Sequence, residues 1–385
     1  MHELKLLGKT GRNGESMKAR DLMNDTLKDY NPYIAGGIAH LWMGPKAKEI
    51  VKLNSNEMQL GPSPKAMEAM RDEIKRGHLY PRPVVLALKA KVAEYVGKEP
   101  ECVTMYCGAD AAIQTICETF LNHDDELLVC SPTYMLYYKL PFRFGAKLAE
   151  AHSSDGVSTD LDALYNAITD KTKLVFICNP NNPTGTLVDN RKLDEFVEKL
   201  PPHVICVIDE AYYDWITEEN YESALRFVND RNNVIVLRTF SKIYGMAGLR
   251  VGYSVANKDI TECLGCVSTY YNANRIGAAG AIAALDDEEF RKKAFDNNKE
   301  QKEYLTKELE KMGVSVVPSQ ASFIYFNPHC DAELCTKKLE DYGVFIRPID
   351  KTYTRVTIGL PHQNRIFLDA LKEILKELRN AEKAE

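Results

Sequence analysis

The sequence lacks an apolar run long enough to cross a membrane, and it lacks a surplus of basic residues. Among its 385 residues, acidic side chains outnumber basic ones by 55 to 49, which gives a net charge of −6. A chain of this charge has no general electrostatic attraction for the phosphates of a nucleic acid. Residues 1–8 also lack the apolar core of a secretory signal. We therefore expect neither a membrane nor a nucleic acid among its partners.

The sequence also lacks the dense cysteine spacing of a disulfide framework, although it contains ten cysteines. Cys130, Cys178 and Cys206 stand in apolar runs, where a buried free thiol is the usual occupant. Cys263 and Cys266 form a C-x-x-C pair, but no second pair stands at the spacing of a zinc site. These features predict reduced thiols, a cytoplasmic protein and no metal site.

Apolar segments rich in valine, isoleucine, leucine and cysteine alternate with helical segments through the middle of the chain. This alternation is typical of an α/β fold, in which helices cover both faces of a mostly parallel sheet. Helices are also expected before the first of these strands, over residues 64–76 and up to about 96. The predicted strands of the sheet span residues 103–106, 126–130, 146–151, 173–178, 204–208 and 234–237.

The pattern changes after about residue 288. A long charged helix is predicted over residues 288–312, and short strands and further helices after it indicate a smaller α+β unit. We expect residues 1–55 to form an arm and part of the small domain, residues 56–287 the large domain, and residues 288–385 the small C-terminal domain. The elements predicted for the small unit are strands 314–317, 322–326 and 355–358 and helices near 331–341 and 364–380, with a further short strand at 50–53.

Polar motifs follow several of the predicted strands of the large sheet, at the point where each strand ends. Asp209 follows the strand 204–208, and Lys242 lies shortly after the strand 234–237. Ligands of open α/β sheets bind beyond the carboxyl ends of the strands, so these side chains are expected to meet at one site. A lysine at the end of a buried strand is costly unless its amine is used, and one use is a covalent link to a carbonyl cofactor.

The residue types at these strand ends match what pyridoxal phosphate requires. Lys242 can form the imine, and Asp209 can face the pyridine nitrogen and keep it protonated. Asn182 and Tyr212 can donate hydrogen bonds to the phenolate oxygen of the ring. Tyr134 can lie against the face of the ring, although a lone tyrosine in this position is also a common core residue.

The phosphate of this cofactor needs donors at the start of a helix. Gly108, Ala109 and Asp110 open a predicted helix and can offer backbone N–H groups to it. Ser241 and Arg250 can add a hydroxyl and a guanidinium to the same dianion.

In their order and spacing, these motifs resemble the fold-type-I pyridoxal-phosphate aminotransferases, and among them the histidinol-phosphate aminotransferase group. The resemblance extends from about residue 30 to the C-terminus. It implies an aspartate-aminotransferase-like fold, with a three-layer α/β/α large domain and a smaller α+β domain. The motifs that carry it are Leu53 to Glu57, Tyr80-Pro81, Cys107 to Asp110, Asn179 to Gly185, Asp209 to Tyr212, Thr239 to Arg250 and Arg355 to Gly359.

The resemblance also implies an activity. A ping-pong reaction would move an amino group from histidinol phosphate or an aromatic amino acid to a 2-oxo acid such as 2-oxoglutarate. Lys242 would be the Schiff-base lysine and would carry the proton. Asp209 would pair with the pyridine nitrogen, and Tyr212 would bind the phenolate oxygen. The residues named above for the phosphate would hold it.

The family further implies a homodimer with shared active sites, because Tyr80 would reach the phosphate bound by the partner subunit. Arg355 and Arg347 would hold the anionic group of the substrate, with Asn182 beside them. Tyr33 would belong to an N-terminal segment that closes over the substrate.

The sequence departs from the family around the substrate entrance. Glu57 is followed by Met58-Gln59-Leu60 instead of Asn-Pro, and Gly36-Gly37-Ile38 replaces a glycine-lysine pair. Residues 42–45 form part of an additional stretch in the N-terminal segment. These differences leave the substrate open while the motifs of the cofactor site are present.

Two other classes of function share the cofactor site. One is a lyase such as a threonine-phosphate decarboxylase, or an enzyme that modifies amino acids; the decarboxylases usually have His-Gly-Gly-Asn where this chain has Asn54 to Glu57. The other is a non-catalytic sensor domain that binds pyridoxal phosphate. A sensor needs a DNA-binding extension, and residues 1–22 are too short for a winged helix.

Overall fold

A seven-stranded sheet forms the larger part of the molecule in this computed structural model, which describes residues 19–27, 44–229, 233–269 and 271–382. The strand order is β2-β8-β7-β6-β5-β3-β4, and only β8 runs antiparallel to its two neighbours. The predicted α/β fold with a mostly parallel sheet is therefore confirmed. The strands are β2 (Val103–Tyr106), β3 (Glu126–Ser131), β4 (Lys147–His152), β5 (Thr172–Cys178), β6 (Ile205–Asp209), β7 (Val234–Thr239) and β8 (Gly252–Val255).

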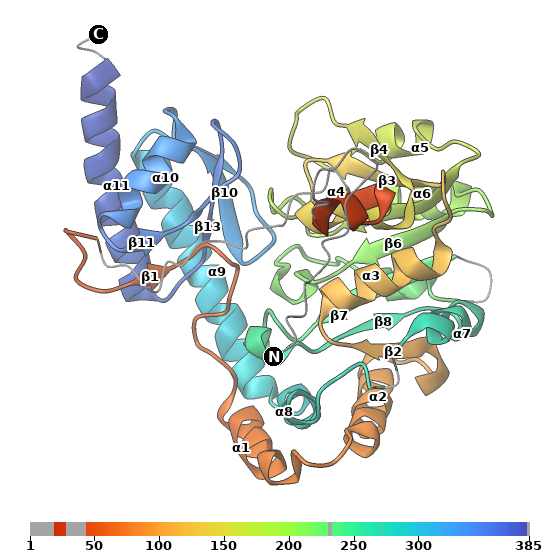
Figure 1. Cartoon of the computed structure of the whole chain (residues 1–385). Helices are drawn as coiled ribbons and strands as arrows, with labels where there is room; N and C mark the ends of the chain where they lie inside the picture. Colours follow the sequence, from red (N-terminus) through yellow and green to blue (C-terminus); the bar gives the residue numbers. More distant parts are fainter. Residues whose placement is uncertain (1–18, 28–43, 230–232, 270, 383–385) are drawn as a thin grey trace, which may run out of the picture.

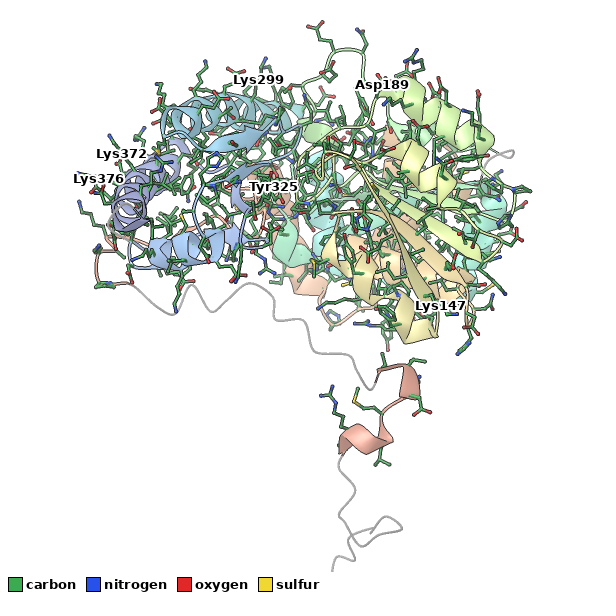
Figure 2. The ribbon with its side chains drawn as sticks, turned by 90° about the horizontal axis from the view of Figure 1, so that it is seen from above. Lys147, Asp189, Lys299, Tyr325, Lys372 and Lys376 are labelled. Atoms are coloured by element: carbon green, nitrogen blue, oxygen red, sulfur yellow. The ribbon has the colours of Figure 1, made fainter. Side chains whose placement is uncertain are left out.

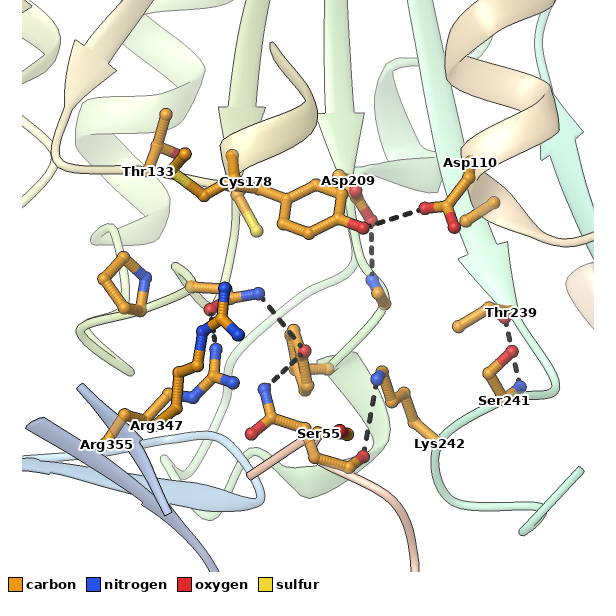
Figure 3. A pocket seen from close by; sticks show the side chains of 18 of the residues that line it. Ser55, Asp110, Thr133, Cys178, Asp209, Thr239, Ser241, Lys242, Arg347 and Arg355 are labelled. Carbon is orange, nitrogen blue, oxygen red and sulfur yellow. Dashed lines mark hydrogen bonds between the residues drawn. The ribbon is translucent and has the colours of Figure 1, made fainter. Parts of the chain in front are cut away.

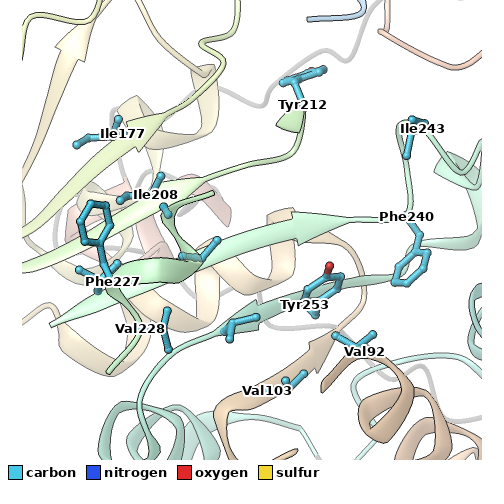
Figure 4. Close-up of a cluster of buried hydrophobic side chains, with 14 of the residues drawn as sticks. Val92, Val103, Ile177, Ile208, Tyr212, Phe227, Val228, Phe240, Ile243 and Tyr253 are labelled. Carbon is cyan, nitrogen blue, oxygen red and sulfur yellow. The ribbon is translucent and has the colours of Figure 1, made fainter. Parts of the chain in front are cut away.

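Side chains of the central strands alternate between two separate apolar clusters, one on each face of the sheet. In β6, Cys206 and Ile208 join the first cluster, whereas Ile205 and Val207 join the second. The first cluster is closed by α2 (Arg82–Val96), α5 (Leu161–Asn166), α6 (Asn190–Lys199) and α8 (Arg275–Leu285), and part of it is drawn in Figure 4. The second is closed by α3 (Ala109–Phe120), α4 (Met135–Lys139) and α7 (Lys258–Val267). Burial on both faces explains why these strands read as continuous apolar runs.

A second, smaller sheet lies beside the first (Figure 1), with the strand order β12-β13-β10-β9. The strands are β9 (Ser315–Val317), β10 (Phe323–Asn327), β12 (Arg347–Pro348) and β13 (Thr354–Thr357). The long helix α9 (Glu288–Lys311) leads into this unit from α8, and α10 (Ala332–Glu340) and α11 (Pro361–Glu382) pack against it. Seen from above, Lys299, Lys372 and Lys376 lie on its outer surface (Figure 2).

The segment that precedes α1 contributes a strand to this smaller unit. Strand β1 (Val51–Lys52) pairs in parallel with β11 (Val344–Phe345), and Val51 and Leu53 are fully buried in a third apolar cluster. The chain then crosses to the larger part through Asn54–Asn56 and enters α1 (Pro64–Glu73). The residues that link the two parts therefore pass directly over the carboxyl ends of the large sheet.

Most boundaries agree with the sequence prediction within one or two residues. The helix predicted over 64–76 is α1 followed by a 3-10 turn at Ile74–Arg76. Residues 19–22, in the segment expected to form an arm, are a short 3-10 helix, and Asp25–Leu27 form another. Helices α4, α7 and α8 and strands β8, β11 and β12 were not predicted. No helix in the described part of the chain combines the length and apolarity that crossing a membrane requires.

Strand β7 is two residues longer than predicted because it ends in polar residues that are nevertheless buried. The Arg238 guanidinium donates to the Glu210 carboxylate, with Nε at 3.0 Å and the salt bridge at 2.9 Å. Ser223 lies within hydrogen-bonding distance of both side chains, and the Arg238 guanidinium lies over the Tyr213 ring. This pairing compensates the two charges, so β7 stays in the sheet up to the residues that precede Lys242.

We expect Glu210→Gln to destabilise the protein strongly, because it leaves the buried Arg238 charge uncompensated. The free energy of unfolding in urea should fall by about 3 kcal/mol. Asp296→Asn removes a surface partner of Lys292 and serves as the control, with an expected loss below about 1 kcal/mol. Equal losses in the two variants would show that the buried pair does not support the end of β7.

Candidate active site

A cavity of about 610 Å³ lies where the large sheet faces the smaller unit (Figure 3). Its walls come from the carboxyl ends of β3, β5, β6 and β7, from the start of α3, from the crossing segment 54–56 and from β12 and β13. The strand ends that the sequence predicted to meet therefore do meet. Of the predicted site residues, those that line the cavity are Ala109, Asp110, Tyr134, Asn182, Asp209, Tyr212, Ser241, Lys242, Arg250, Arg347 and Arg355.

Lys242 lies three residues after the end of β7 and points into this cavity (Figure 3). Its Nζ donates to the backbone carbonyl of Asn56 at 3.4 Å and lies 5.3 Å from the centre of the Tyr212 ring. These contacts are long, and no carboxylate forms an ion pair with Lys242 among the described residues. The amine is held loosely at the centre of the site, as an amine that reacts must be.

Asp209 is the last residue of β6 and is only 3% exposed. Tyr137 Oη donates to its Oδ2 at 2.7 Å, and the backbone N–H of Ala211 donates to its Oδ1 at 3.0 Å. Burial raises the pKa of the Asp209 carboxyl from 3.8 to about 6, although both hydrogen bonds lower it. In the part of the chain that the structure describes, neither hydrogen-bond partner of the Asp209 carboxylate is cationic, which suits a ligand that brings a positive charge.

Tyr137 was not identified from the sequence as a site residue. Burial and the Asp209 charge raise its pKa, so the phenol stays protonated and remains a donor. It follows Tyr134 by three residues, a spacing that places two side chains on one side of a helix. In the structure the two rings meet edge to face, with centroids 5.5 Å apart. That spacing was the signal available in the sequence.

Tyr212 is 3% exposed, and its hydroxyl lies next to two asparagines. Asn56 Nδ2 donates to Tyr212 Oη at 2.9 Å, and Asn182 Nδ2 lies 3.5 Å from the same oxygen. The Tyr212 ring meets the Phe323 ring edge to face at 5.1 Å. Asn56 belongs to a motif singled out in the sequence, but its contact with Tyr212 was not predicted.

The start of α3 forms a cradle for an anion. Gly108 precedes the helix with a φ of 85°, and a Cβ there would lie 2.5 Å from an Arg250 nitrogen, so only glycine fits. Arg250 donates to Ser241 Oγ at 3.2 Å and to Asp110 Oδ2 at 3.2 Å. Free backbone N–H groups of the first helical turn, a hydroxyl and a guanidinium thus converge.

Asp110 was assigned from the sequence to the binding of the phosphate. In the structure its side chain has another role. Its carboxylate accepts from Arg250 and, at 2.9 Å, from Tyr134 Oη. A carboxylate repels a phosphate, so Asp110 can contribute only its backbone N–H to an anion. Its side chain instead ties the Tyr134 ring to the cradle.

Arg347 and Arg355 stand directly opposite each other in the pairing of β12 with β13. Directly opposite residues of an antiparallel pair project from the same face, and both side chains reach from the smaller sheet toward the cavity (Figure 3). Arg355 is 8% exposed and donates to Asn182 Oδ1 at 2.5 Å and to the Asn54 carbonyl at 3.0 Å. The structure therefore brings two guanidinium groups to the side of the cavity opposite the large sheet.

Of the predicted site residues that the structure describes, Tyr80 and Gly108 are not among those that line this cavity, and Gly108 stands directly before α3. Tyr80 is 72% exposed and stacks on Tyr271, with ring centres 4.3 Å apart. Arg275 holds the loop by donating to the Tyr80 carbonyl at 2.7 Å. Tyr33 lies outside the described residues, as do Gly36 to Ile38.

The residues around the cavity match the chemical groups of pyridoxal phosphate. Asp209 offers a buried anion for a protonated ring nitrogen, and Tyr212 and Asn182 offer polar groups to the phenolate oxygen. The α3 cradle offers an anion site, and Lys242 stands between these groups with its amine directed into the cavity. The two arginines of the smaller sheet line the same cavity.

Comparison with known proteins supports this interpretation. Residues 48–371 match the family model described as aminotransferase class I and II. A histidinol-phosphate aminotransferase of Moorella thermoacetica is 40% identical over 357 residues, which cover 91% of this chain and 92% of that protein.

Solved structures share the fold. A structure described as a histidinol-phosphate aminotransferase from Sinorhizobium meliloti in complex with pyridoxal-5'-phosphate superposes with a TM-score of 0.86 at 24% identity, covering 92% of this chain and 98% of that one. A structure described as a putative histidinol-phosphate aminotransferase from Erwinia carotovora atroseptica superposes at 0.83 with 26% identity, covering 87% and 99%. The chain therefore belongs to the class I and II aminotransferases, the pyridoxal-phosphate-dependent family that its sequence resembles.

Proposed function

We propose that this aminotransferase takes the amino group of histidinol phosphate and passes it to a 2-oxo acid such as 2-oxoglutarate in a ping-pong reaction. Aromatic amino acids are the second class of donor that the site would accept. The observation that carries the proposal is the pair Arg347 and Arg355, opposite each other on β12 and β13 and facing the Lys242 cavity. Two guanidinium groups match the charge of a phosphate monoester.

In this proposal the bound cofactor withdraws electrons from the carbon that bears the amino group, which makes the proton on that carbon removable. The Lys242 amine removes and returns this proton, and at rest it links the cofactor to the chain. The Asp209 carboxylate would keep the ring nitrogen of the cofactor protonated. Tyr137 keeps that carboxylate in place.

The remaining residues of the cavity position the reacting groups. Backbone N–H groups of Ala109 and Asp110, together with Ser241 and Arg250, bind the cofactor phosphate. Tyr134 covers one face of the ring, with its hydroxyl held by Asp110. Asn182 contacts both Tyr212 and Arg355, so it couples the cofactor side of the cavity to the substrate side.

We also propose a cytoplasmic homodimer in which Tyr80 completes the phosphate site of the partner subunit. The exposure of Tyr80, its fixed loop and its position outside its own chain's cavity support this role. All ten cysteines are thiols and none is in a disulfide, which supports a reducing compartment. We propose a division at residues 55 and 287 as well. The third apolar cluster, which joins Val51 and Leu53 to residues between 305 and 378, supports it, whereas Ala294, Ala321 and Phe323 pack in the first cluster.

Replacing Lys242 by Ala should lower the turnover number at least about 10³-fold, because proton transfer loses its general base. The holoprotein should also lose the visible absorption band of a cofactor joined to lysine. Lys258→Ala, on the exposed side of α7, is the control and should keep both. Transamination by Lys242→Ala at the wild-type rate would rule out this role.

Replacing Arg347 by Gln should lower kcat/KM for histidinol phosphate about 10- to 100-fold, since a hydrogen bond between charged groups is lost. The loss for phenylalanine, which lacks the phosphate, should be smaller. Arg191→Gln changes an exposed arginine of α6 and should have no effect. A donor screen on the wild type that finds no turnover of histidinol phosphate would overturn the proposed donor.

The Asp209 carboxyl should make the apoprotein less stable as the pH rises. Its folded pKa of about 6 lies above the ordinary 3.8, so its stabilisation is complete below pH 4 and is lost as the pH rises through 6. Relative to Asp209→Asn, wild-type apoprotein should lose about 3 kcal/mol between pH 4 and pH 8 in urea unfolding. Bound cofactor should remove this difference, since its positive ring nitrogen pairs with the anion. A difference that does not change with pH would contradict the assignment.

A further inference from the structure

The Tyr212 hydroxyl has its two acceptor positions directed toward asparagines. Asn56 Nδ2 lies 2.9 Å from Tyr212 Oη, and Asn182 Nδ2 lies 3.5 Å from it. An amide NH₂ group only donates, so the phenol accepts in both contacts. Within the described residues, Tyr212 Oη donates no hydrogen bond. Its own hydrogen is therefore left to point toward the cavity.

The orientation of the Asn56 side chain follows from its contacts with β13. The Asn56 backbone N–H donates to Thr357 Oγ1 at 2.9 Å, and the same hydroxyl donates to Asn56 Oδ1 at 3.3 Å. The carbonyl end of the amide is thus turned toward Thr357, which leaves the NH₂ end for Tyr212. Asn56 is 2% exposed, so water does not compete for either end.

The backbone of Asn56 is held in a conformation that few residues adopt. Its φ is 53°, in the left-handed region, where asparagine is better tolerated than most residues with a side chain. Its carbonyl also accepts the Lys242 Nζ hydrogen bond. One residue therefore contacts the smaller sheet, the reactive lysine and the phenol of the larger part.

We infer that Asn56 is a positioning residue that directs the Tyr212 hydroxyl hydrogen into the cavity, toward the phenolate oxygen of the cofactor. This inference rests on the proposed role of Tyr212. A donor held in this direction stabilises the phenolate without having to reorient when the charge develops. Because Thr357 holds Asn56, the smaller unit takes part in setting the direction of this donor.

The test is a pH titration of the visible absorption band of the holoenzyme. Tyr212→Phe removes the donor, so the phenolate oxygen becomes more basic and the midpoint pH should rise by about one unit. Asn56→Gly removes the amide and fits the left-handed backbone. It should raise the midpoint in the same direction, by no more than Tyr212→Phe does. The charged groups that line the cavity are unchanged in both variants: Asp110, Asp209, Lys242, Arg250, Arg347 and Arg355.

The double variant decides whether the effect passes through the phenol. In the Tyr212→Phe background, Asn56→Gly should produce no further rise, because the hydroxyl it positions is absent. Asn220→Gly makes the same substitution at an exposed residue with a φ of 63° and should leave the midpoint unchanged. If Asn56→Gly does not fold, Asn56→Asp replaces it in the wild-type and Tyr212→Phe backgrounds. The added charge shifts the midpoint in both backgrounds, so it cancels when the two shifts are compared.

The outcomes separate this inference from the proposed function. An unchanged midpoint in Tyr212→Phe would overturn the proposed role of Tyr212 itself. A raised midpoint in Tyr212→Phe with none in Asn56→Gly would overturn the positioning role alone. Equal rises from Asn56→Gly in both backgrounds would also overturn it, because Asn56 would then act without the phenol.

Discussion

The buried carboxylate of Asp209 is the constraint on which the rest of the site depends. Taking a carboxylate out of water at the end of a fully buried strand is costly. Among the described residues, hydrogen bonds from Tyr137 and from the Ala211 N–H are the only two that compensate it. The carboxyl is accordingly less acidic than in water. A positively charged ring nitrogen brought by the cofactor would complete its environment, so the protein keeps a local cost that binding offsets.

The second feature of the site is that neither part of the molecule forms it alone. The large sheet supplies Asp209, Tyr212 and Lys242, whereas β12 and β13 supply the two arginines. The segment 54–56 joins them by hydrogen bonds to Arg355, to Thr357 and to Tyr212. A movement of the smaller unit would therefore shift the anion-binding arginines and the environment of the cofactor phenolate together.

Much of the fold was open to prediction because the central strands are buried on both faces. Such strands appear in the sequence as short runs of branched apolar residues, so β2, β5 and β6 were located within a residue or two. The last two residues of β7 were missed because Arg238 is polar, and its burial depends on Glu210, which directly follows the neighbouring strand β6. A salt bridge between two residues that are far apart in the chain cannot be predicted from the sequence around either one.

By itself the sequence determined the parallel sheet, the family and the residue types at the strand ends, because burial, turn chemistry and motif spacing are properties of consecutive residues. Only the tertiary structure decided which of these residues meet. It placed Tyr137 on Asp209 and Asn56 on Tyr212, and it placed Tyr80 outside its own cavity. Asn56 and Tyr212 are 156 residues apart in the chain, and they meet because the segment 54–56 passes the cavity at the carboxyl ends of the large sheet.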